Sequence, residues 1–252
     1  RSHLFFRKLE EEFSVSPRPE YVWQRYSSTV WSLLCDSQPE AVCEWVERFS
    51  DADKLPTQLM SGLPALLRHD VTRVVGWFAS RTAWFATQRF PAGLARWARR
   101  ADPVILSKLA DGLILIDPDD FAKLISRLPY PLRASLFEGA TAQFETSHTE
   151  WTPGLLRVLP RYLRDREAKR MLALPRAKTD GSWRRNLLGM RDIDSVRDTL
   201  QVEASSAQAQ ERGEAHAALV RSTCGSGSGL DLTLAWLART KNEQDPVRSA
   251  FL

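Results

Sequence analysis

Apolar residues recur along most of the chain at intervals of three or four positions. Six segments show this spacing clearly: 42–49, 71–78, 105–116, 121–128, 155–163 and 193–200. A period near 3.6 residues places such side chains on one face of an α-helix. No segment of comparable length alternates apolar and polar residues with a period of two, as a half-buried strand does. The pattern therefore predicts an all-α protein.

Capping residues stand where the apolar stripes begin. The residues predicted to cap helices are Asp70, Asp102, Asp117, Thr152 and Asp245, and the last four each precede a proline. At a helix start the side-chain oxygen accepts from an unpaired amide, and a proline has no N–H group to leave unpaired. Residues 37–40, Ser-Gln-Pro-Glu, fit a capping box. The chain is therefore divided into short helices joined by short links.

Stripes and caps together predict a succession of short helices. We expect them near residues 19–35, 39–49, 56–68, 71–80, 91–100, 103–116, 118–128, 131–144, 153–164, 166–174, 182–189, 192–203, 207–222, 230–240 and 246–252. A short helix with one apolar stripe cannot bury itself alone and needs neighbours on both sides. Antiparallel helical hairpins stacked into a right-handed α-solenoid satisfy this condition.

The end of the chain resembles a known repeat family. Residues 245–252, Asp-Pro-Val-Arg-Ser-Ala-Phe-Leu, resemble the first helix of a HEAT repeat, in which an Asp-Pro cap precedes a Val-Arg pair and small core residues. Residues 210–220 are similar about 36 residues earlier, and 165–172 about 44 residues earlier again, near the 40–47 residue period of the family. The resemblance is clearest over 165–252 and implies a HEAT-like (armadillo/HEAT-type) superhelix.

The resemblance divides the chain at about residue 150. Residues 151–252 are expected to form HEAT-like repeats. Residues 1–150 lack the Val-Arg signature, and either divergent repeats or a separate helical domain fits them. Leu252 falls inside the expected first helix of a repeat, and no second helix follows it in this sequence. Natural solenoids end instead in a polar capping repeat. We therefore expect a fragment of a longer protein, truncated at its C-terminal end.

Composition limits the compartment. Apolar residues make up 43% of the 252 residues, enough for a large core. The three cysteines, Cys35, Cys43 and Cys224, follow no CxxC spacing and are odd in number, which favours a reducing interior. No apolar run approaches the ~20 residues of a membrane span. We expect a cytoplasmic protein with no membrane contact.

No pattern of catalytic residues stands out. The four histidines lie far apart, and none has a cysteine or histidine partner at metal-ligand spacing. The glycine-rich segment 225–229 follows a predicted helix rather than the strand that a phosphate-binding loop requires. We expect no enzyme activity, no metal and no cofactor in this chain.

Charge is the feature that bears on a partner. Arginine outnumbers lysine 28 to 7, which is typical of a GC-rich bacterial genome, and the net charge is +4. Residues 157–191 hold 11 basic and 3 acidic residues, a balance of +8 that leaves −4 for the remainder. Arg157, Arg161 and Arg164 have the spacing of one helix face. The candidate partner-binding residues are Arg157, Arg161, Arg164, Trp183, Arg184, Arg185, Arg96, Trp97 and Arg100.

The architecture favours a non-catalytic scaffold for protein–protein interaction, whose concave surface holds another protein. Two alternatives stay open. The basic stretch 157–191 would suit a nucleic-acid-binding repeat protein, including one that resembles the HEAT-like DNA glycosylases. The chain would also suit a helical regulatory region of a larger enzyme. The same arginines would also fit an outer helix face that contacts only solvent and has no binding role.

Overall fold

All regular secondary structure in the described part of the chain is helical. The computed structural model describes residues 2–18, 20–238 and 247. No strand occurs in these ranges, so the predicted all-α class is confirmed. Contacts between Cα atoms group the chain into two compact units. Unit 1 comprises Arg1–Pro129 and Ser135–Thr141, and unit 2 comprises Tyr130–Ala134 and Ala142–Leu252.

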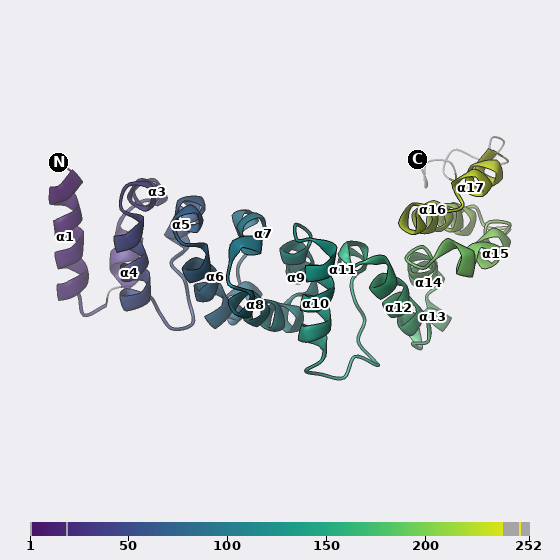
Figure 1. Ribbon diagram of the computed structural model, residues 1–252, viewed down its shortest axis with the longest axis horizontal. Coiled ribbons are helices and arrows are strands. Elements are labelled where there is room, and N and C mark those ends of the chain that lie inside the picture. Colours follow the sequence, from purple (N-terminus) through teal and green to yellow (C-terminus); the bar gives the residue numbers. More distant parts are fainter. Residues whose placement is uncertain (1, 19, 239–246, 248–252) are drawn as a thin grey trace. The chain divides into compact units, whose positions relative to one another are not determined.

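Unit 1 is a succession of short helices (Figure 1). Its elements are α1 (Ser2–Val15), α2 (Glu20–Arg25), α3 (Ser28–Ser37), α4 (Pro39–Phe49), η1 (Thr57–Ser61), α5 (Leu63–His69), α6 (Val71–Ser80), η2 (Thr82–Ala86), α7 (Ala92–Trp97), η3 (Ala98–Arg100), α8 (Pro103–Ile116), α9 (Pro118–Ile125) and part of α10 (Tyr130–Thr141). Helices α3, α5, α7 and α9 contact one another in that order. On the other side α6 contacts α8, and ion pairs join α4 to α6. The helices of unit 1 therefore form two layers.

Unit 2 is also built from neighbouring helices. Its elements are α11 (Pro153–Val158), α12 (Arg161–Leu172), α13 (Arg176–Thr179), α14 (Gly181–Leu188), α15 (Ile193–Glu203), α16 (Ala209–Ser226) and α17 (Leu230–Leu237). Helix α14 contacts α12 and α16, and α16 also contacts α15 and α17. Buried Leu188, Ile193, Val196 and Leu219 form a shared core of three of these helices. Each helix thus buries its stripe against helices close to it in sequence.

Tryptophans form much of the core of unit 1. Trp31 is fully buried, with its ring centroid 4.6 Å from that of Trp23, and its indole N–H donates to the Trp23 carbonyl at 3.0 Å. Phe13 packs on Trp23 at 4.8 Å. Trp45, Trp77 and Trp84 are also buried. The aromatic content therefore serves packing first.

Most of the predicted caps are present. Asp102 accepts from the amides of Val104 and Ile105, and Asp70, Asp117 and Thr152 cap their helices in the same way. The predicted capping box is wrong. Gln38 stands directly before α4, and its side chain makes no capping hydrogen bond. The Ser37 hydroxyl, which the capping box requires as an acceptor at the start of α4, donates instead to the Leu33 carbonyl one turn back. Asp245 lies outside the described residues.

Several helix boundaries differ from the predicted ones for local reasons. Helix α1 was not predicted, although Phe5, Leu9 and Phe13 lie four residues apart on it. The predicted helix 19–35 is two helices, α2 and α3. The predicted helix 153–164 ends at Val158, because Leu159 precedes a proline and takes an extended backbone. Of the HEAT-like segment 245–252, only Val247 is described, and it is buried.

Among the described residues, no helix is both long and apolar enough to span a lipid bilayer.

Two glycines give a matched test of the packing in unit 1. A Cβ atom on Gly62 would lie 2.5 Å from Cys35 Sγ, whereas one on Gly139 in α10 would meet nothing within 4 Å. We expect Gly62→Ala to lower the free energy of unfolding by about 1–3 kcal/mol, because this core has no room. Gly139→Ala should raise it by about 0.5–1 kcal/mol through helix propensity. Urea denaturation of both variants measures this; a Gly62→Ala variant as stable as Gly139→Ala would contradict the packing.

The three cysteines should differ in reactivity. Burial raises the pKa of the Cys35 and Cys43 thiols to about 12, whereas Cys224 is exposed. A thiol with that pKa stays protonated at pH 8.5, and the thiolate is the nucleophile. We expect iodoacetamide at pH 8.5 to label Cys224 alone in the folded protein and all three residues in urea. Peptide mass spectrometry reads the sites; rapid native labelling of Cys35 or Cys43 would contradict the burial.

Candidate functional site

The two arginines of α12 from the predicted basic site are engaged inside unit 2. Arg161 Nη1 donates to the Ser226 carbonyl at 2.5 Å, and its other nitrogen Nη2 pairs with the Asp192 carboxylate. Arg164 Nη2 donates to the Gly225 carbonyl at 2.7 Å. The last carbonyls of a helix lack donors within it and form the negative end of its dipole. Arg161 and Arg164 thus cap α16, which explains why that helix extends beyond the predicted residue 222.

Arg184 and Arg185 also pair within the unit. Arg184 lies 2.6 Å from a Glu203 oxygen, and Arg185 lies 2.9 Å from a Glu214 oxygen and 3.6 Å from Glu203. Burial alone would raise the pKa of Glu214, but hydrogen bonds from Gln210 and Arg185 outweigh it and lower that pKa. The Arg185 side chain is only 11% exposed. These two arginines join α14 to α15 and α16 rather than form an open basic face.

Trp183 is buried as well. Its backbone amide donates to Asp180, and the Arg176 guanidinium lies 5.0 Å from its ring centroid. Arg176 in turn pairs with Glu150 at 2.8 Å. Trp183 is therefore part of the packing around α13 and α14.

Arg157 does not share a helix with Arg161 and Arg164, so the predicted single face is wrong. Pro160 separates α11, which ends at Val158, from α12, which begins at Arg161. Arg157 is exposed and forms no ion pair among the described residues. Within the predicted basic stretch it is thus one of the arginines left to solvent.

The predicted residues of unit 1 lie in a different electrostatic setting. Residues 81–101 hold five arginines and no aspartate or glutamate. Arg89, Arg96 and Arg99 are exposed, and none of them forms an ion pair or hydrogen bond within the described part of the chain. The Arg100 guanidinium lies 4.6 Å from the Trp97 ring centroid, a cation–π contact. The charges of Arg89, Arg96 and Arg99 therefore have no carboxylate partner among the described residues.

A groove of about 690 Å³ lies beside this segment. We call it the α5–α7 groove; it is lined by Thr57, Met60, Leu63, Pro64, Trp84, Thr87, Gln88, Arg89, Phe90, Pro91 and Gly93. Most of these side chains are apolar or aromatic, and Arg89 is the only charged one. Gly93 belongs to α7, the helix that carries Arg96. The groove thus combines an apolar lining with a basic rim.

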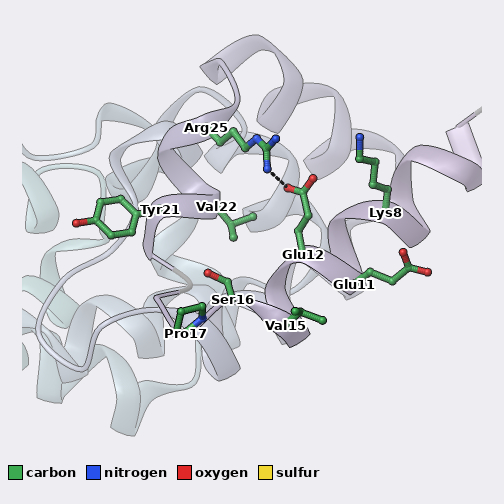
Figure 2. Close-up of a pocket in the computed structure, with 9 residues that line it drawn as sticks. All are labelled: Lys8, Glu11, Glu12, Val15, Ser16, Pro17, Tyr21, Val22 and Arg25. Atoms are coloured by element: carbon green, nitrogen blue, oxygen red, sulfur yellow. Dashed lines mark ion pairs between the residues drawn. The ribbon is translucent and has the colours of Figure 1, made fainter.

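A second hollow, of about 550 Å³, lies between α1 and α2 (Figure 2). Its charges are mixed: Lys8 and Arg25 stand against Glu11 and Glu12. Arg25 pairs with Glu12 at 3.3 Å, and the Tyr26 hydroxyl also donates to that carboxylate. Internal pairing leaves this hollow with less net charge for a partner than the α5–α7 groove has.

No family model, curated protein or solved structure matches this chain. In the described ranges, no three or more His, Cys, Asp or Glu side chains gather closely enough to hold a metal ion. The candidate site is therefore chosen on geometry and charge alone.

Sequence reasoning named Arg96, Trp97 and Arg100 but missed Arg89 and the groove. The signal was present in the sequence as the absence of any acidic residue from 81–101. A count of basic residues favours the longer stretch 157–191, because it ignores carboxylates that lie farther along the chain. Glu203 and Glu214, which pair with its arginines, fall outside that stretch.

Two arginines of the basic stretch give a matched test of these roles. Arg185→Ala should lower the free energy of unfolding by about 2 kcal/mol, because it removes the ion pair of partly buried Glu214 and one of the two arginines that pair with Glu203. Arg157→Ala should change it by less than about 0.5 kcal/mol, because Arg157 is exposed and unpaired. Urea titrations at pH 7 compare the two variants. Equal stabilities would show that Arg185 does not hold the helices together.

Proposed function

We propose that this chain is a non-catalytic scaffold for protein–protein interaction, built from HEAT-like helical hairpins. One observation carries the proposal: hydrogen bonds between helices recur at similar separations in sequence. In unit 1 most of them join residues 26 to 33 apart, as in Arg73–Glu47, Arg68–Asp36 and Arg73–Glu40. This spacing is what a repeating array of helical hairpins requires.

Unit 2 supports the same proposal. Arg161 and Asp192 are 31 residues apart, Arg185 and Glu214 are 29 apart, and Ile193 bonds the Ser226 hydroxyl 33 residues on. The pitch of about 30 residues is shorter than the 40–47 residues of HEAT repeats. We therefore propose a compact right-handed α-solenoid of HEAT type, with shortened helices in each hairpin.

A protein fits the available surface better than a nucleic acid does. The alternative of nucleic-acid binding rests on the arginines of 157–191, of which Arg161, Arg164 and Arg185 are engaged in internal hydrogen bonds. In unit 1, Arg89 lines an apolar groove, and Arg96 lies on α7, the helix that contributes Gly93 to that groove. Apolar anchors with a charged rim are the usual composition of a protein–protein interface. The free thiols support a cytoplasmic location for the proposed scaffold.

Affinity capture from the native host tests the scaffold. The bait is the full chain, with a double variant, Arg96→Glu and Arg99→Glu, and a matched control, Arg7→Glu and Arg127→Glu. All four arginines are exposed residues of unit 1 without a partner among the described residues. We expect one protein in stoichiometric amount on the wild-type and control baits, and about tenfold less on the double variant.

Quantitative mass spectrometry of the eluates decides the outcome. Failure of every bait to retain a stoichiometric protein would overturn the scaffold. Retention of nucleic acid, sensitive to salt and lost on nuclease treatment, would replace it with the nucleic-acid alternative.

A further inference from the structure

The α5–α7 groove has the size and lining of a binding site for one side chain of a partner protein and the residues next to it in the partner's sequence. Its volume of about 690 Å³ lies within the 300–1,000 Å³ of typical ligand sites. Met60, Leu63 and Phe90 give it an apolar lining, and Pro64 and Pro91 add rigid apolar surface. Such a lining gains free energy by covering a large apolar group. The groove therefore favours an aromatic or branched aliphatic anchor.

One donor of the lining makes no hydrogen bond within unit 1. The indole N–H groups of Trp23, Trp31 and Trp77 each donate to an oxygen atom of unit 1. Trp84 lines the groove, and its indole N–H donates to no atom of the described residues. Its nitrogen is not among the fully buried atoms that lack a partner, so this donor is accessible to solvent when no ligand is bound. A ligand in the groove would supply the acceptor through a backbone carbonyl or a carboxylate.

The positive charge around the groove favours a ligand that carries acidic groups. Arg89 lines it, and Arg96 lies one turn beyond Gly93, roughly 5 Å farther along α7. Both lie within a Debye length of about 8–10 Å from a bound segment. No carboxylate belongs to the lining. Acidic residues of a ligand would therefore meet unpaired guanidinium groups.

The aromatic side chains of the groove do not offer stacking platforms for bases. The Trp84 ring packs edge-to-face on Phe78 and Phe85, at centroid distances of 5.6 and 5.3 Å. Phe90 stacks on Phe85 at 5.7 Å. Single-stranded nucleic acids bind through exposed aromatic faces, which these rings do not present. The arrangement favours a peptide over a nucleic acid.

We infer that the α5–α7 groove binds a short acidic segment of a partner protein, in which one large apolar side chain lies beside aspartate or glutamate residues. The apolar side chain occupies the groove, the acidic residues face Arg89 and Arg96, and an oxygen of the segment accepts from Trp84. The inference rests on the proposed scaffold function and names the chemistry of its partner.

Selection of a random 12-residue peptide library displayed on phage tests the inference on the full chain. We expect enriched peptides that carry an aromatic or large aliphatic residue flanked by aspartate or glutamate. Fluorescence anisotropy with the most enriched peptide then measures its Kd. Arg89→Glu should raise that Kd at least tenfold, and Gly93→Phe should raise it similarly by filling the groove without changing charge. A Cβ at Gly93 would meet only Leu67 at 3.7 Å, so this position accepts a side chain.

Arg127→Glu is the matched control, because Arg127 is an exposed arginine of unit 1 outside the groove lining. Its Kd should stay within twofold of wild type, and circular dichroism confirms that all variants are folded. Enrichment of no peptide, or of peptides whose binding ignores both groove variants, would overturn the inference. So would displacement of the peptide by a fluorescein-labelled DNA duplex at physiological salt. A partner captured from the host whose retention ignores Arg89→Glu and Gly93→Phe would leave the scaffold standing and remove the groove as its site.

Discussion

The arginine side chain that reaches from one helix to carboxylates of another is the interaction on which the rest of the structure depends. The helices are too short to be stable alone, so each requires a fixed place against its neighbours. Arg73 shows how that place is set: its guanidinium bonds both oxygens of Glu47 at 2.6 and 2.7 Å and reaches Glu40 at 2.7 Å. Apolar stripes drive the helices together, and these directional bonds determine which turns meet.

Arginine suits this task because its planar group offers several donors in fixed directions. The Arg73 and Arg185 side chains are 22% and 11% exposed, so their stems pack while their charges are paired. Hydrogen bonds from Arg73 and Trp77 outweigh burial and lower the pKa of Glu47. The carboxylate thus stays ionised, and its contribution to stability is present at neutral pH and is lost as pH falls through that lowered value. Formal charge in the sequence is consequently a poor measure of charge at the surface.

The sequence predicts the fold class well, because helix periodicity and caps such as Asp102 depend only on nearby residues. It predicts the candidate site poorly, because pairing depends on distant ones. Arg161 meets the carbonyl of Ser226, which is 65 residues away, and no local pattern signals that contact. Arg157 was grouped with it by spacing, yet one proline separates their helices. A search for segments that lack aspartate and glutamate finds Arg89, whereas a count of basic residues does not.

The separation of about 30 residues between many of the bonded side chains also has a mechanical meaning. In the proposed array of helical hairpins, tension applied along the chain would meet one interface between helices at a time rather than the whole core. Each hairpin released would add about 30 residues, or roughly 100 Å of extended chain. Such an array would yield in steps and gain length before it loses all of its structure.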